Sequence, residues 1–262
     1  MTLNDADLSD IKKAKQLLEK GGVAVSMGNW CGHATEKISE RLPLAWRRTL
    51  SFLTILAIEK SWEFSIGMMS DPDKPADDEL NHKIYATISG AIGGVAIPTL
   101  LAELPVTTVI MFRSVADMAR EEGENFQDME TRIACLEVFA LGGGYSDQEG
   151  ASGSSYYKTR EFLERPIIES SKYIAQKGAV GLGVPFLGQL IAKIAARYQT
   201  LVAARIAASV VPIAGAICGA AVNIVFIDHF QKKARGHFIM RRLEKKYGLE
   251  KVKLSYNQAS FS

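Results

Sequence analysis

Apolar residues recur every three or four positions along most of the chain, which is the spacing of amphipathic helices. The first such run lies between Asp10 and Lys20, with Ser9 as its expected N-cap and the pair Gly21–Gly22 as its end. Pro105 is expected to open a helix, because proline is tolerated in a first turn. Further helices are predicted over residues 23–41, 43–69, 105–122, 127–141, 156–175, 189–210 and 213–247. The alternation typical of strands is nowhere convincing, so the sequence predicts an all-α, multi-helix bundle.

Polar and glycine-rich segments divide these helices. Residues 71–78 contain two prolines and four acids and are predicted to form a loop. The run 142–155, rich in Gly and Ser, is the expected internal boundary of an otherwise single helical domain over residues 1–262. Gly248 is expected to end the last helix and to leave a polar tail.

Two uncharged stretches bear on where the protein acts. Ile84–Ala102 has 19 residues and Ile206–Ile227 has 22, and about 20 apolar helical residues span a bilayer. Both are rich in Gly and Ala and are interrupted by proline, as in the buried centre of a soluble bundle. The sequence therefore leaves open a pair of central apolar helices or a membrane-inserting hairpin. Close helix packing is expected at small residues spaced by four, which are Gly90, Gly94, Gly215 and Gly219, the last followed by Asn223.

A basic helix follows the second uncharged stretch. Seven of the 31 basic residues lie in the fifteen positions 232–246, with aromatic residues within and beside them. An anionic lipid surface attracts such a helix by about 1 kcal/mol for each cation near it. The alternative is a solvated helix end whose cations favour the negative pole of the helix dipole. The residues expected to face a membrane are Lys232, Lys233, Arg235, Arg241 and Arg242.

Composition narrows the functional classes. The chain has 262 residues, 31 Lys and Arg against 29 Asp and Glu, and a formal charge of +2, which disfavours a general nucleic-acid binder. The three cysteines are widely spaced and the four histidines show no metal-ligand pattern, so no disulfide framework, metal or cofactor is expected. A phosphate-binding loop and a serine-hydrolase elbow are both missing. The acidic start is unlike a signal peptide and predicts a protein that is not secreted by the usual route.

Charged residues in the first half offer candidate chemistry. Arg113 and Asp117 are four residues apart and are expected to pair on one helix face, with Arg120 also within reach of Asp117. Glu103 precedes Pro105, where a carboxylate gains from the positive helix N-terminus. A structural ion network and a catalytic acid–base pair are both compatible with this pattern.

Three longer motifs resemble those of a known bacterial family, the EcsC protein family. They are ELPVTT at 103–108 with FRSVADMAR at 112–120, CLEVFALGG at 135–143, and the run 223–238. The resemblance implies a helical, non-secreted bacterial protein that acts near the inner membrane, since the family is named after a component encoded beside an ABC transporter. It implies no catalytic set. The positions to which it draws attention are Glu103, Thr107, Arg113, Asp117, Asn223, Asp228 and His229.

The leading hypothesis is a membrane-associated accessory or lipid-binding protein of the bacterial cell envelope, linked to a transporter. We expect it at the cytoplasmic face of the inner membrane, with membrane lipid, an inner-membrane protein or a second copy of the chain as partner. The first alternative is a hydrolase that acts on a lipid or envelope substrate, with Asp117, Asp228 and His229 as acid–base candidates. The second alternative is a soluble helical scaffold.

Overall fold

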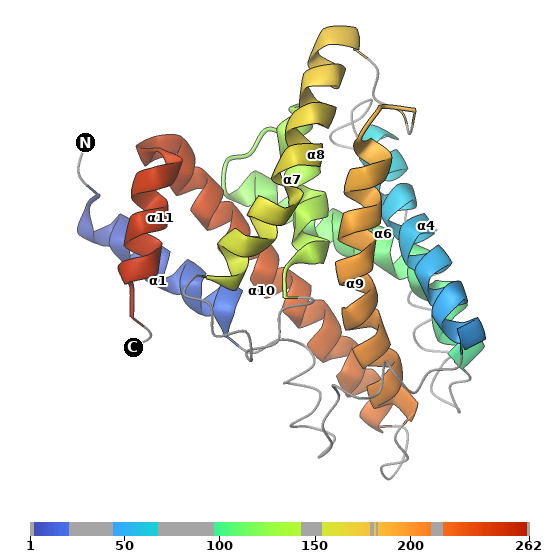
Figure 1. The fold of residues 1–262 in the computed structure, drawn as a ribbon. Coiled ribbons are helices and arrows are strands. Elements are labelled where there is room, and N and C mark those ends of the chain that lie inside the picture. The colour runs from blue at the N-terminus through green and yellow to red at the C-terminus, as the bar shows by residue number, and fades with distance from the viewer. Residues whose placement is uncertain are drawn as a thin grey trace.

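The computed structural model describes residues 3–20, 44–67, 97–142, 154–178, 181, 183–210 and 217–260 (Figure 1). Its helices are α1 (Asp5–Glu19), α4 (Leu44–Gly67), α6 (Ile97–Glu121), α7 (Met129–Glu137), the 3-10 turn η2 (Val138–Ala140), α8 (Ser155–Lys177), α9 (Leu187–Val210), α10 (Ile217–Tyr247) and α11 (Leu249–Gln258). No strand occurs in these ranges, and the prediction of an all-α helical bundle is confirmed. The predicted helix over 23–41 and the predicted loop over 71–78 lie outside the described residues.

Two predicted helix starts are wrong. α1 begins four residues before Ser9, because the side chain of Asn4 accepts a hydrogen bond from the amide of Asp7 at 2.7 Å and caps the helix there. α6 begins eight residues before Pro105, which lies inside the helix. A proline in a helix interior removes one backbone hydrogen bond, and the packing of α6 against α4 and α10 offsets that loss.

The expected polar tail is a helix, α11. Val252 and Tyr256, four residues apart on one face, are buried where α11 packs against α1 and α10. Gly248 has a φ of +88°, a conformation that residues with side chains rarely adopt, and it turns the chain from α10 into α11. Gly248 therefore ends the last predicted helix as expected, but it also begins another.

Neither uncharged stretch forms one continuous apolar helix within the described residues. The last six residues of Ile84–Ala102 begin α6, and Ile206–Ile227 is divided between the end of α9 and the start of α10. In the ranges that the structure describes, no helix combines the length and the apolar character needed to cross a membrane. The positions Gly90, Gly94 and Gly215, and the surroundings of Gly219 and of the Asn223 side chain, lie outside what the structure describes.

Two apolar cores hold the described helices together. The larger core, which includes Trp62, Phe112, Phe139 and Phe230, lies among α4, α6, α7, η2, α8, α9 and the part of α10 up to Phe238. The smaller core lies among α1, the first turn of α8, the second half of α10 and α11. Figure 1 shows α10 passing diagonally from the larger group of helices to the pair formed by α1 and α11. α8 and α10 each contribute to both cores, so they carry the junction between them.

The C-terminal end of α1 is fixed by polar contacts between helix ends. Lys15 Nζ donates to carbonyls at the end of α11 at 2.7 and 2.9 Å, and Lys233 of α10 donates to the carbonyl of Leu18. Glu19 accepts a hydrogen bond from the hydroxyl of Ser154, the N-cap of α8, at 2.5 Å. Cations at helix C-termini and a carboxylate at a helix N-terminus match the helix dipoles, so these contacts attach α1 to three neighbouring helices.

Candidate functional site

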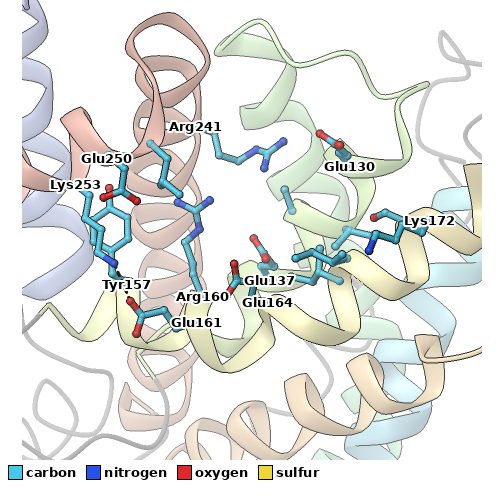
Figure 2. Close-up of a pocket in the computed structure, with 16 residues that line it drawn as sticks. Glu130, Glu137, Tyr157, Arg160, Glu161, Glu164, Lys172, Arg241, Glu250 and Lys253 are labelled. Carbon is cyan, nitrogen blue, oxygen red and sulfur yellow. Dashed lines mark hydrogen bonds and ion pairs between the residues drawn. The ribbon is translucent and has the colours of Figure 1, made fainter.

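A pocket of about 540 Å³ opens where the two cores meet, between α7, α8, α10 and α11 (Figure 2). α7 supplies residues 130, 133, 134 and 137, which share one helix face. α8 supplies about half of the lining residues, and α11 closes one side with its first two turns. The charged residues of the lining are Glu130, Glu137, Glu161, Glu164, Glu250, Arg160, Lys172, Arg241 and Lys253.

Glu137 is the most buried carboxylate of this lining. It is the last residue of α7, and its side chain is 7% exposed. Its Oε2 lies 3.4 Å from Nε2 of His237, on α10. Burial raises the pKa of the Glu137 carboxyl, but the adjoining His237 and the guanidinium groups of Arg160 and Arg241 outweigh burial, so the pKa lies below its ordinary value. Glu137 is therefore ionised at neutral pH.

A chain of buried polar groups lies behind Glu137. Arg160 Nη1 donates to the hydroxyl oxygen of Tyr156 at 3.3 Å, and this hydroxyl lies 3.0 Å from Nδ1 of His237. Burial lowers the pKa of His237, so the imidazole is neutral. When Tyr156 donates to Nδ1, the ring proton lies on Nε2, on the side of Glu137. Nε2 has no hydrogen-bond partner among the described residues, and its contact with the carboxylate is long.

The two arginines of the pocket are engaged with carboxylates outside its lining. Arg160 Nη1 lies 2.6 and 2.8 Å from the two carboxylate oxygens of Glu244 on α10. Arg241 donates to Glu124 at 3.1 Å, and Lys245 donates to the same carboxylate at 2.8 Å. Burial raises the pKa of Glu124, but Lys245 and Arg241 outweigh it and lower the pKa to about 2. Both guanidinium charges are thus neutralised within the protein.

The two lysines of the pocket also have acidic neighbours. Lys253 of α11 donates to Glu161 of α8 at 2.8 Å, which links the two helices at one end of the pocket (Figure 2). Lys172 lies 3.8 Å from Glu169 on the same helix. Every cation of the lining therefore has a carboxylate partner within reach.

The carboxylates of the lining are less completely paired. Glu130, Glu164 and Glu250 take part in no ion pair within the ranges that the structure describes. Glu137 faces a neutral imidazole rather than a cation in its direct contact. The pocket therefore presents an excess of unpaired negative charge.

Apolar side chains complete the lining. Ile133 and Ile167 line the inner wall, and Ile168 and Leu249 remain 41% and 46% exposed although they are large and apolar. The hydroxyl of Ser171 also lies in the lining, and its buried oxygen has no hydrogen-bond partner among the described residues. The pocket thus combines unpaired acceptors, an unpartnered hydroxyl and exposed apolar surface, which are features of a ligand site.

The structure does not bring the predicted acid–base residues together in this pocket. The side chains of Asp117 and Asp228 are 54% and 48% exposed on different helices, α6 and α10. His229 is buried, and burial together with the nearby Lys233 lowers its pKa to about 3. Within the described residues, no group of three or more His, Cys, Asp or Glu side chains is arranged to hold a metal ion.

The polar residues predicted on α6 are engaged locally. Asp117 pairs with Arg120 at 2.9 Å, three residues on, rather than with Arg113. The hydroxyl of Thr107 donates to the carbonyl of Glu103 at 2.8 Å, a bond within the helix. Burial raises the pKa of Glu103 above its ordinary value. None of these residues lines the pocket.

The five residues predicted at a membrane surface do not share one environment. The side chains of Lys232 and Arg235 are 56% and 50% exposed. Lys233 is buried and donates to a carbonyl at the end of α1. Arg241 and Arg242 donate to carboxylates at 3.1 and 2.8 Å. Contact of Lys232 and Arg235 with a membrane stays a prediction.

The sequence analysis missed the pocket, although two of its motifs meet beside it. Glu137 belongs to the motif 135–143 and His237 to the motif 223–238, and the structure places their side chains in contact. The same two motifs also meet where Nε2 of His229 lies 3.3 Å from the carbonyl of Leu141. The spacing of residues 130, 133, 134 and 137 was the available signal for a shared face, but the helix alone does not show what that face meets.

The fold and the pocket define an all-α protein with two cores and a charged, apolar-rimmed cavity between them. Residues 15–243 match the EcsC protein family, and the chain belongs to this family. The resemblance carried by the three motifs is thereby confirmed. A search of curated proteins and a search of solved structures found no match. The α11 residues of the pocket follow the matched range.

Proposed function

We propose that this EcsC-family protein is a ligand-binding accessory protein whose pocket holds an organic ammonium ion against Glu137. The observation that carries the proposal is an ionised, buried carboxylate that lines a pocket with incomplete hydrogen bonding. A carboxylate has about four lone-pair positions, and the contact from His237 serves one of them at long range. Because Glu137 lines the pocket, its remaining positions can accept hydrogen bonds from a ligand, and an ammonium group supplies three donors and the opposite charge.

The pairing pattern favours a cation over an anion. An anionic ligand would have to compete with Glu244 for Arg160 and with Glu124 for Arg241. A cationic ligand also has neighbours of its own sign in Arg160 and Arg241, but both of these are held by carboxylates outside the lining, and Glu130, Glu164 and Glu250 take part in no ion pair within the described ranges. The lining has five carboxylates against four cations, and carboxylates repel an anion and attract a cation, so the pocket is complementary to a positive group.

Acid–base catalysis has less support than binding. A general base works best when its pKa lies near the operating pH, and the pKa of Glu137 is shifted below that of an ordinary glutamate. His237 is neutral and buried, so it cannot supply a proton at neutral pH. His229, with a pKa of about 3, has the same limitation. The groups are suited to hold charge rather than to transfer protons.

The proposed accessory role keeps the partner expected from the resemblance, an inner-membrane protein or lipid at the cytoplasmic face. The family match over residues 15–243 supports it only through that resemblance, which implies a protein that acts near the inner membrane. An accessory protein of this kind would sense or deliver a ligand for its partner.

Calorimetry with three six-carbon probes tests the proposal. We expect saturable binding of n-hexylammonium to the whole chain, and much weaker binding of hexanoate and 1-hexanol, which have the same chain length. Glu137→Gln should lower the affinity for hexylammonium about 10- to 100-fold, because it removes a charged hydrogen-bond acceptor. The matched control is Glu63→Gln, on α4 and exposed, which should change nothing.

Either of two results would overturn the proposal. One is hexanoate binding as tightly as hexylammonium to the unmodified protein, a comparison that needs no variant. The other is a folded Glu137→Gln protein, as judged by its melting curve, that binds hexylammonium with unchanged affinity.

A further inference from the structure

We infer that the ligand of this pocket is an amphiphile, an ammonium group joined to an alkyl chain that lies along the apolar rim formed by Ile168 and Leu249. The inference rests on the proposed function, because it assigns the charged end of the ligand to Glu137. It adds the chemical class of the remainder of the ligand and the residues that select it.

The apolar part of the lining supports a chain rather than a compact cation. Ile133, Ile167 and Ile168 line the pocket from α7 and α8, and Leu249 lines it from α11. Two of them, Ile168 and Leu249, are large side chains that stay 41% and 46% exposed. Covering such surface is favourable, and a ligand that fills only the charged end would leave it in water.

The position of these side chains separates the two ends of the ligand. Glu137 is buried at the end of α7, whereas Ile168 and Leu249, on two different helices, remain exposed to solvent. An ammonium group at Glu137 would therefore leave its substituent to cover the exposed apolar side chains of the lining. The cavity of about 540 Å³ lies within the range of small-molecule sites, so it has room for both parts.

A series of linear alkylammonium ions from four to eight carbons tests this inference by calorimetry. Each methylene that becomes buried should raise the affinity by up to ~4-fold, the factor that corresponds to burying one CH₂ group. Leu249→Ser and Ile168→Ser should flatten this dependence on chain length, because they remove the surface that the chain covers. Leu254→Ser is the matched control, since Leu254 is on α11 and exposed but does not line the pocket.

The two proposals fail in different ways in this experiment. Glu137→Gln should lower the affinity for every alkylammonium ion by the same factor. It should leave unchanged the slope, which is the gain in the logarithm of the affinity for each added methylene. A slope near zero in the unmodified protein, or an unchanged slope in the folded Leu249→Ser and Ile168→Ser variants, would overturn the alkyl chain while leaving the ammonium site intact. A normal slope that Glu137→Gln does not displace would instead overturn the ammonium site.

The same chemistry can come from a soluble amine or from an aminolipid in a bilayer. Phosphatidylcholine vesicles with and without stearylamine distinguish these sources by co-sedimentation. If stearylamine vesicles capture the protein and Glu137→Gln abolishes that capture, the ligand is a lipid of the bilayer. Monomer binding without vesicle capture would assign it to a soluble amine, and binding in neither arm would overturn the inference.

Discussion

Replacement of Gly142 by alanine should destabilise the junction of the two family motifs. Gly142 has a φ of +82°, and a Cβ atom there would lie 2.6 Å from Cε1 and 2.9 Å from Nε2 of His229. The left-handed backbone costs a residue with a side chain about 1–2 kcal/mol. Forcing an atom into a packed interior costs about 1–3 kcal/mol more. We therefore expect Gly142→Ala to lower the free energy of unfolding by about 2–5 kcal/mol.

Two comparisons separate the backbone cost from the steric cost. Gly123 also has a φ of +82°, but a Cβ atom there would meet nothing within 4 Å, so Gly123→Ala measures the backbone cost alone. His229→Ala removes the imidazole that a Cβ at 142 would strike. In the His229→Ala background, Gly142→Ala should cost little more than Gly123→Ala does in the unmodified protein, because the one tight contact left is Cε of the flexible Lys233 side chain at 3.2 Å. The free energies are measured by urea unfolding followed by far-ultraviolet circular dichroism.

The steric reasoning depends on His229 being unable to move aside. The imidazole is 6% exposed, and its ring packs edge-on against Phe230 with the centroids 5.1 Å apart. If it is fixed as described, the two substitutions should be non-additive by about 1–3 kcal/mol. Additivity to within about 0.5 kcal/mol, together with equal effects of Gly142→Ala and Gly123→Ala, would refute the reasoning.

Two further predictions concern the packing of α1 on α10. A Cβ at Gly236 would lie 2.7 Å from Cγ of Leu18 and 3.1 Å from the carbonyl oxygen of Ala14. Gly236→Ala should therefore lower the free energy of unfolding by about 1–2 kcal/mol, although alanine has the better helix propensity. If urea unfolding shows the variant to be more stable, α1 can shift away from α10 without loss of stability. Burial lowers the pKa of Lys233 from 10.5 to about 8, so the unfolded chain binds one proton more than the folded chain between these values, and stability should rise with pH. Relative to a Lys233→Met variant, the unmodified protein should gain roughly 2 kcal/mol between pH 7 and 9.5 in the same assay, and parallel pH profiles would contradict the buried charge.

Periodicity predicted the long helices because each buries one continuous face. Periodicity failed for α11, because only Val252 and Tyr256 are buried there. Two apolar positions among charged residues are too few to form a recognisable helical pattern. It also misplaced the start of α6, since the rule that favours proline in a first turn is local, whereas the packing of α6 against α4 and α10 is not.

The candidate site could be predicted less well than the fold. Each motif supplied one member of the contact between Glu137 and His237, but the two residues are far apart in sequence, and helical spacing places residues only on their own helix. The basic residues of α10 illustrate the same limit. Lys233 is buried and Lys232 is exposed, a difference set by the docking of α1 and not by composition.

An ion pair between the two cores, Arg160 with Glu244, explains why the space beside it stays open as a pocket; we call this pair the charged seam. Arg160 and Glu244 have side chains only 21% and 10% exposed, and their ion pair joins α8 to α10 where apolar residues could have closed the gap. Desolvating such a pair offsets much of its attraction, and well-packed apolar residues of similar volume are often equally or more stabilising. The seam is therefore not the arrangement that stability alone favours. Paired charges keep α8 and α10 joined without filling the space beside them, and they leave Glu137 as the buried carboxylate that a ligand can still complete.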